Sequence, residues 1–233
     1  MKCIFHYLPL VCLLGFTSQF ANAQSQFDLN LGFGTATDKA SSTGIDVNPT
    51  SGLLFGCTAA ADPTCVPTKS LSGFMLGFGG DVLLWKHVGF GADVNIQPVK
   101  QNYAVFQTAS ADQVGYTQQS RVTFYDFNAI VEPISQKRVA LKIFGGVGGA
   151  NLKFYQNETG SDVLVGNVNS SSYYGSSNHF DVDFGAGLQI YVSGGFFVRP
   201  EVRIHYVNNF SQFGSNIVPE YMAWIGYNWG GNH

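Results

Sequence analysis

The amino-acid sequence predicts an all-β chain that folds as an antiparallel, up-and-down transmembrane β-barrel of eight strands. Three observations lead to this prediction. Hydrophobic residues make up 45% of the 233 residues and charged residues only 12%, which is about half the charged share of an ordinary soluble domain. The body of the chain has no apolar run long enough for a membrane-spanning helix. Apolar and polar residues instead alternate, as in strands whose two faces meet different surroundings.

The first 23 residues predict a secretory signal peptide that is removed from the mature chain. Lys2 supplies a positive charge, residues 8–16 are apolar, and Ala21-Asn22-Ala23 is a small-x-small cleavage site. An uncleaved anchor is the alternative, but this apolar stretch is too short to span a bilayer. Residues 24–233 are then expected to form a single domain, the β-barrel.

Alternation defines the strands in chain order, and it is clearest in residues 180–190, where every second side chain is apolar. In a soluble β-sandwich such a face would be the core, so alternation alone does not choose between the two folds. Most of the predicted strands have about ten residues or slightly more, the length that a tilted strand needs to cross a bilayer. The eight strands are expected at about 26–35, 70–83, 89–100, 121–132, 139–154, 179–191, 196–207 and 217–229.

The connections between these strands alternate in length. Those after the second, fourth and sixth strands are short, whereas the other four are long and polar. Short turns on one rim and long loops on the other are the asymmetry of outer-membrane barrels. A soluble sandwich has no reason to sort its loops by strand parity, so this observation selects the membrane barrel. The long loops are expected at about 36–69, 101–120, 156–178 and 208–216.

Five aromatic residues lie beside a short turn or near the C-terminus, and they predict an interfacial girdle at one rim of the barrel. The alternative is chance, because aromatic residues make up 15% of the chain. The girdle residues are Trp85, Tyr191, Phe196, Tyr227 and Trp229.

Cys57 and Cys65 are the two cysteines that remain after the predicted cleavage. In an exported chain, two cysteines with seven residues between them predict a disulfide that closes a short loop. A zinc site is the weaker alternative, because no histidine lies near the pair. The mature chain has 11 basic and 15 acidic residues, a net charge of −4, and this balance excludes a typical nucleic-acid-binding protein.

The strand at 196–207 carries the most charge, and its charged side chains share one parity. If the opposite, apolar parity faces lipid, these side chains point into the barrel. Eight strands enclose an interior that side chains just fill, and buried charges must be paired to be tolerated. The predicted polar network of the lumen contains Arg199, Glu201, Arg203, His205, Asp181, Asp183, Asp126 and Lys142. Other inward candidates are Asp28, Asn30, Asp81, Asp93, Asn95, Asn128, Gln189 and Glu220.

Two features of the sequence suggest other chemistry but lack its requirements. The run Gly145–Gly149 is glycine-rich, yet it lacks the Lys-Ser/Thr of a phosphate-binding loop and lies within a predicted strand. Its glycines are expected to let the strand bend or to make room for side chains opposite. His205 near carboxylates suggests the base of a lipid hydrolase, but Val207 stands where such an enzyme needs its serine.

Three segments resemble the small outer-membrane β-barrel superfamily, the OmpA/OmpX-like eight-stranded group. They are the turn Leu84–Gly89, the strand Phe196–Arg203 and the aromatic last strand Tyr221–Trp229. The resemblance extends over the mature chain but is a pattern match. One departure is that residues 230–233 follow Trp229, whereas members of the group often end on an aromatic residue.

The resemblance and the pattern together imply a bacterial outer-membrane protein with both termini in the periplasm. Its expected partners are outer-membrane lipid, the barrel-assembly machinery and an extracellular protein or glycan bound by the long loops; no cofactor is expected. The expected function is non-enzymatic, with a side-chain-filled lumen and loops that serve surface interaction or envelope integrity. The alternatives are a small passive pore and a lipid A-modifying hydrolase.

Overall fold

The computed structural model describes residues 25–38, 44–46, 54–57, 65–67, 72–85, 87–107, 113–162, 166–210 and 215–231. Every regular element among these residues is a β-strand. An apolar helix of membrane-crossing length is absent from this part of the chain. The predicted signal peptide lies outside the described residues and remains a prediction.

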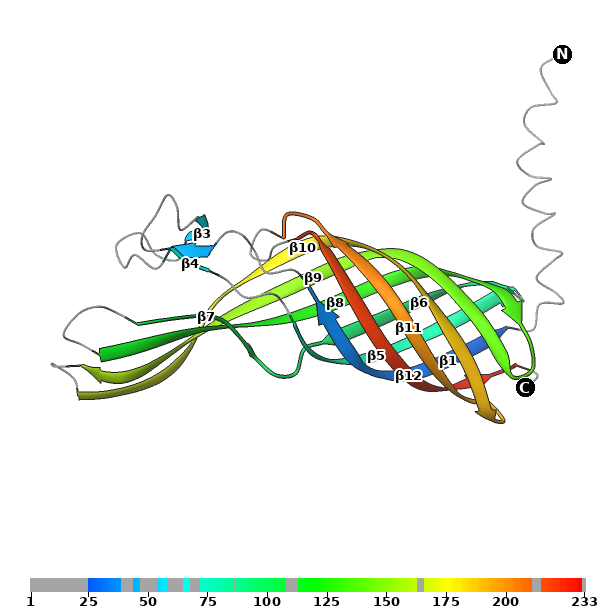
Figure 1. Cartoon of the computed structure of the whole chain (residues 1–233). Coiled ribbons are helices and arrows are strands. Elements are labelled where there is room, and N and C mark those ends of the chain that lie inside the picture. The colour runs from blue at the N-terminus through cyan, green and yellow to red at the C-terminus, as the bar shows by residue number, and fades with distance from the viewer. Residues whose placement is uncertain are drawn as a thin grey trace, which may run out of the picture.

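Eight antiparallel strands pair into a closed ring, and Figure 1 shows that this ring forms a barrel. Neighbours along the chain pair in turn around the ring, and the pairing of the first strand with the last closes it. The predicted fold class and the number of barrel strands are therefore confirmed. The eight strands are β1 (Gln26–Thr37), β5 (Ser72–Trp85), β6 (Val88–Ile96), β8 (Gln113–Ser135), β9 (Val139–Asp162), β10 (Gly166–Ser193), β11 (Phe196–Val207) and β12 (Ile217–Trp229).

Burial alternates along the ring strands with a period of two, because successive side chains point to opposite faces of a sheet. In β11, Arg199 and Arg203 are buried inside, whereas Val202 between them is 49% exposed on the outside. Large apolar side chains surround the closed sheet; Leu31, for example, is 63% exposed and Phe127 67%. Such a continuous apolar outer surface needs an apolar surrounding, which a lipid bilayer provides.

The short connections and both ends of the barrel domain lie at the same rim. The start of β1 pairs with the end of β12, Phe27 opposite Trp229, and also with the end of β5, which leads into a short connection. The β10–β11 turn has two residues between its strands, and Gly194 adopts a left-handed φ of 54° there, a conformation that glycine accepts without strain. We call this end the short-turn rim and the opposite end the long-loop end.

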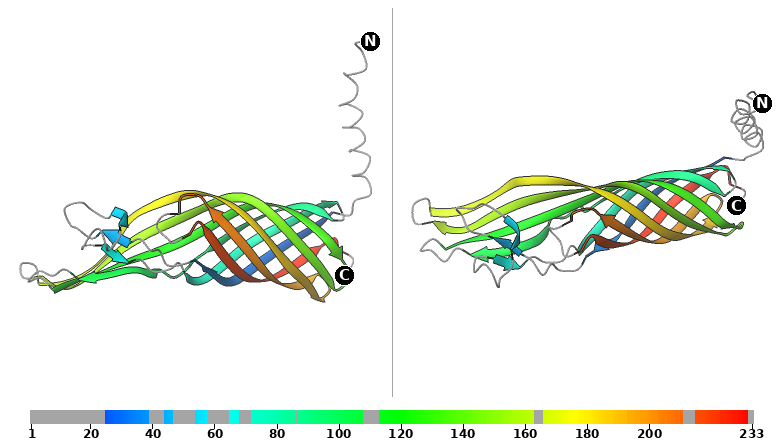
Figure 2. Two further views of the ribbon diagram at one scale, coloured as in Figure 1. Left: turned by 45° about the horizontal axis from the view of Figure 1, so that its top comes forward. Right: turned by 90° about the horizontal axis from the view of Figure 1, so that it is seen from above.

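Strands β8, β9 and β10 continue far beyond the ring at the long-loop end, where β7 (Gln101–Gln107) pairs with β8. Figures 1 and 2 show the resulting protruding sheet. Segments 101–120 and 156–178, predicted as loops, are therefore largely strand. Outside a membrane both faces of a sheet can meet water, and the successive residues Ser170, Ser171 and Ser172 of β10 are all exposed, so no apolar alternation marks this part of the strand.

The first long connection contains a separate small sheet with the order β3-β2-β4. Its strands are β2 (Gly44–Asp46), β3 (Leu54–Cys57) and β4 (Cys65–Pro67). A disulfide joins Cys57 to Cys65, with 5.8 Å between their Cα atoms. The predicted disulfide is thus present, and it ties together the two outer strands of this small sheet.

Candidate functional site

The ionisable side chains inside the barrel form one connected group, which we call the lumen network. The eight residues that the sequence singled out are all buried there: Asp126, Lys142, Asp181, Asp183, Arg199, Glu201, Arg203 and His205. Five further carboxylates join them: Asp28, Asp81, Asp93, Glu132 and Glu220.

Lys142 on β9 organises the part of the network nearer the short-turn rim. Its Nζ forms an ion pair with Asp28 on β1, lies 2.9 Å from Oδ2 of Asp81 on β5, and is 3.6 Å from Oε1 of Glu132 on β8. Asp81 also accepts a hydrogen bond of 2.8 Å from Nη1 of Arg199. Strands on different sides of the ring are thereby joined across the interior.

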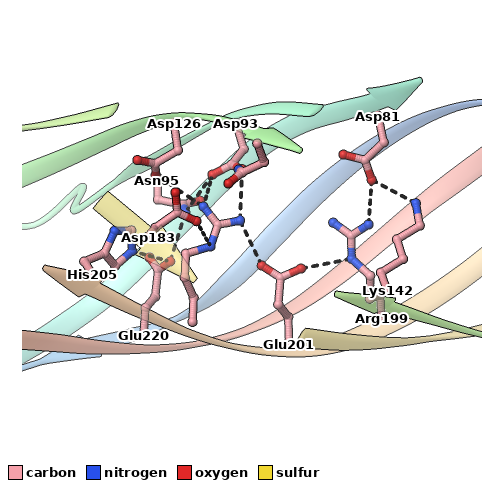
Figure 3. Close-up of polar contacts among 12 residues, drawn as sticks. Asp81, Asp93, Asn95, Asp126, Lys142, Asp183, Arg199, Glu201, His205 and Glu220 are labelled. Atoms are coloured by element: carbon pink, nitrogen blue, oxygen red, sulfur yellow. Dashed lines mark hydrogen bonds and ion pairs between the residues drawn. The ribbon is translucent and has the colours of Figure 1, made fainter. Parts of the chain in front are cut away.

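Glu201 connects this part of the network to the part nearer the long-loop end (Figure 3). Its Oε2 lies 3.1 Å from Nε of Arg199, and its Oε1 accepts a 3.1 Å hydrogen bond from Nη2 of Arg203. Arg203 also donates to both carboxylate oxygens of Asp93, at 2.7 and 2.9 Å, and to Asp126 at 3.2 Å. Two-pronged contacts of this kind between a guanidinium and a carboxylate are among the stronger hydrogen-bonded pairs.

His205 lies at the long-loop end of the network with carboxylates at both ring nitrogens. Its Nδ1 is 2.6 Å from Oδ2 of Asp181, and its Nε2 is 3.3 Å from Oε2 of Glu220. The imidazole stacks on Phe124, with 4.3 Å between the ring centroids. Carboxylates thus face both ring nitrogens, and Val207, two residues further along β11, has no hydroxyl group.

Apolar side chains and buried amides such as Asn30, Asn95 and Gln189 occupy much of the remaining interior. One cluster adjoins His205 and extends along the wall of the lumen: Ala36, Met75, Val122, Phe124, Ala150, Leu152, Phe154, Val207, Phe210, Val218, Met222 and Trp224. Smaller clusters are Leu83, Ile130 and Phe144, and Ala140, Tyr191 and Phe197. A cavity amid Arg199, Arg203 and Lys142 has a volume of about 10 Å³, which is space for one water at most.

The predicted girdle residues fall into two groups. Phe196, Tyr227 and Trp229 lie at the short-turn rim, where the centroid of the Tyr227 ring is 4.8 Å from that of Phe196 and 4.7 Å from that of Trp229. Trp85 is half-buried at the same rim. Tyr191 does not join them, so its assignment to the girdle was wrong. It is 8% exposed and accepts a 2.8 Å hydrogen bond from Gln189 inside the barrel, because it shares the inward parity of its strand.

Glu132 is a member of the lumen network that sequence reasoning missed. It was assigned to the end of a strand beside a short turn, yet β8 continues through it and buries it at 1% exposure. Glu132 has the same inward-facing position in the strand alternation as Asp126 and Asn128, and this parity could have identified it. The partners within the network are not encoded in any local pattern, because they lie on strands far apart in the sequence.

Comparisons with known proteins agree with this architecture. The model of the outer membrane protein beta-barrel domain family matches residues 8–222. A search of the curated proteins finds no match to the sequence. Several solved structures are similar: a major outer membrane protein from Thermus thermophilus has a TM-score of 0.51 at 10% identity, covering 88% of this chain and 99% of that chain.

Two further structures superpose less closely. The outer membrane protein OprG from Pseudomonas aeruginosa gives a TM-score of 0.48 at 13% identity, covering 90% of this chain and 98% of its own. The attachment invasion locus protein Ail of Yersinia pestis gives 0.45 at 14% identity, covering 88% and 99%.

Proposed function

The chain belongs to the family of outer membrane protein β-barrel domains and is a protein of the bacterial outer membrane. From that premise we propose that it is a closed, non-enzymatic barrel whose protruding sheet contacts partners outside the cell. The barrel-assembly machinery would insert it with the short-turn rim and both termini in the periplasm. The lumen then serves stability, and the long-loop end serves recognition.

The filling of the lumen is the observation that carries this proposal. Glu201 joins the ion pairs of Arg199 to those of Arg203, and apolar clusters occupy the space beside them. The cavity at the centre holds no more than a water molecule. A passive pore needs a continuous aqueous path, and an eight-stranded barrel with a packed interior does not supply one.

Recording current through planar bilayers tests whether the lumen is closed. We expect the purified barrel, whose folded form migrates faster on a gel when it is not heated (heat-modifiable migration), to insert and give no steady single-channel current. A large-pored porin in the same bilayers is the positive control, and flotation of proteoliposomes shows that the chain itself has inserted. Stepwise, lasting currents from the folded barrel would overturn the closed lumen and favour the pore.

The chemistry of the protruding sheet supports recognition of a polar partner, either a protein or a glycan. Amide side chains form ladders across its strands: Gln119 donates to Asn102 at 3.0 Å and accepts from Asn157 at 3.0 Å. Tyr155 packs edge to face with Tyr173, with 5.9 Å between centroids, and Nζ of Lys100 lies 3.9 Å from the Tyr155 ring. Ordered amides beside aromatic rings suit hydrogen bonding and stacking with polar ligands.

Protease treatment of intact cells tests the orientation. We expect cleavage in the connections of the long-loop end, including residues 38–72, and protection of the short turns at 136–138 and 194–195. Cells with a permeabilised outer membrane are the control, because periplasmic sites become accessible there. Cleavage of the short turns on intact cells would show that the barrel is inserted the other way round.

A further inference from the structure

The lumen network has surplus carboxylate oxygens around His205. Asp126 on β8, Asp181 on β10 and His205 on β11 are all buried, and one potential ligand atom from each lies within 4.8 Å of the other two. Glu220 on β12 approaches the same imidazole from the other side. These four side chains come from four strands and converge at one place in the lumen.

Several oxygens in this cluster point into the protein without a hydrogen-bond donor among the described residues. They are Oδ1 of Asp126, Oδ1 of Asp181, Oε1 of Glu220 and both carboxylate oxygens of Asp183. Each belongs to a side chain that is 0% exposed. Buried polar atoms are nearly always satisfied in folded proteins, by protein groups or by ordered water, so these oxygens call for a partner from solvent, either water or a cation.

The charge balance of the lumen network points the same way. Nine carboxylates face Lys142, Arg199, Arg203 and His205, so acids exceed bases nine to four even when His205 is protonated. The surplus of acids over bases is concentrated near His205. In the described part of the chain, Arg203 is the one lysine or arginine that forms an ion pair with Asp126 or Asp183. Buried charge without compensation is costly, and a divalent cation would remove two units of it.

The glycine run of β9 provides the space for this cluster. In the sheet, Gly148 pairs with both Asp126 and Asp181, and Gly146 pairs with Asp183. A Cβ at Gly148 would collide with Oδ1 of Asp126, and a Cβ at Gly146 would lie 2.9 Å from Oδ1 of Asp183. Missing side chains on the middle strand thus allow the carboxylates of the flanking strands to lean toward each other.

We propose that Asp126, Asp181 and Nδ1 of His205 bind a divalent transition-metal ion inside the barrel. Ligands on opposite sides of such an ion are about 4.2 Å apart, since metal–oxygen and metal–nitrogen bonds are about 2.1 Å. To bind one ion, the widest spacing, up to 4.8 Å, has to shorten, and the 2.6 Å contact between Nδ1 and Oδ2 of Asp181 has to lengthen, each by about half an ångström. Glu220 accepts the Nε2–H of the imidazole, the outer-shell contact that orients a metal-bound histidine. One imidazole with carboxylates suits Mn²⁺, Fe²⁺ or Zn²⁺.

The bound ion would cross-link three strands, and its ligands would be as distant in the sequence as residues 126 and 205. It does not depend on what the protruding sheet binds or on the absence of conductance. The competing occupant of the cluster is a proton on His205, held between Asp181 and Glu220. Direct counting of metal in the folded barrel separates the two.

The experiment refolds the untagged mature chain from urea into detergent micelles with Mn²⁺ alone or Zn²⁺ alone, because apolar side chains adjoin the site and loading during folding is the direct route. Excess metal is removed by gel filtration with EDTA, and bound metal is counted by inductively coupled plasma mass spectrometry. We expect about one ion per heat-modifiable barrel. A folded wild-type barrel without metal overturns the proposal and leaves the proton as the occupant.

Variants distinguish this site from adventitious binding. We expect Asp126→Asn and His205→Gln each to retain at least tenfold less metal. Glu132→Gln removes another buried carboxylate of the lumen, beside Lys142, and is expected to keep the full equivalent. Each variant is scored only in its heat-modifiable, folded fraction, so failure of one variant to fold leaves the other to decide. Equal metal in all three variants would show an adventitious ion and overturn the assignment.

Discussion

Replacement of Arg203 by methionine removes the cation that holds the long-loop half of the lumen network together. Its guanidinium donates to Asp93 at 2.7 and 2.9 Å, to Glu201 at 3.1 Å and to Asp126 at 3.2 Å, and it is 2% exposed. Methionine fills much of the space of the arginine stem but leaves Asp93 and Asp126 without their base, whereas Glu201 keeps its contact with Arg199.

The expected loss follows from that geometry. Breaking a buried ion pair by removing one partner costs about 3–5 kcal/mol, because the other charge stays buried without compensation. We therefore expect Arg203→Met to lower the free energy of unfolding by at least about 3 kcal/mol. The measurement is a urea titration of the barrel in micelles, in which the folded fraction is read from its faster gel migration without heating.

Two comparisons make this test decisive. Arg138→Met removes the same charge from an exposed short turn, where a change within about 0.5 kcal/mol is expected. Adding Asp93→Asn to Arg203→Met should recover about 1–3 kcal/mol, because contacting residues couple. If Arg203→Met and Arg138→Met shift the titration equally, the lumen network does not stabilise the barrel and our reasoning is refuted.

Three further predictions concern the outer face, the glycine run and the disulfide. Leu188→Arg puts a charge on the lipid face and should lower the free energy of unfolding by about 2–4 kcal/mol near the midplane. Gln189→Arg places its charge beside Asp28 in the lumen and should cause a smaller loss. Equal losses in urea titrations would contradict the inside–outside assignment. Gly148→Ala should lower the free energy of unfolding by about 1–3 kcal/mol, because the new Cβ would collide with the backbone of Tyr125 and the side chain of Asp126. Gly175→Ala is the control, because open space surrounds its Cβ, and it should change the free energy of unfolding by no more than about 0.5 kcal/mol. Reduction of Cys57–Cys65 should speed the cleavage of residues 38–72 by protease and leave the gel shift unchanged, because the small sheet is separate from the ring. Loss of the gel shift would show that the barrel depends on that sheet.

Much of the barrel was predictable because its signals are local. Alternation in residues 180–190 shows which side chains of β10 face outward, and the same parity correctly places Arg199 and Arg203 inside. Tyr191 was misassigned because its position beside a turn was given more weight than its parity. The protruding sheet was missed because strands that meet water on both faces have no apolar side to reveal them.

The candidate site was predictable only as a set of inward-facing residues. The sequence did not indicate that Glu201 would connect Arg199 to Arg203, or that Asp126 and Asp181 would lean together across Gly148. The first depends on side-chain conformations inside the closed ring. The second depends on the register of three adjacent strands, and the long polar segment between β9 and β10 does not reveal how those two strands align.

By itself, the sequence determined which face of each strand is apolar, since that choice repeats every two residues and needs no knowledge of neighbours. Only the tertiary structure decided which charges meet. Lys142 contacts Asp28, 114 residues away, because closing β1 onto β12 brings the two ends of the sheet together around one interior. The transmembrane barrel was therefore predictable from the local periodicity of the sequence. Its lumen network, and the cation site proposed within it, arise from closure of the ring.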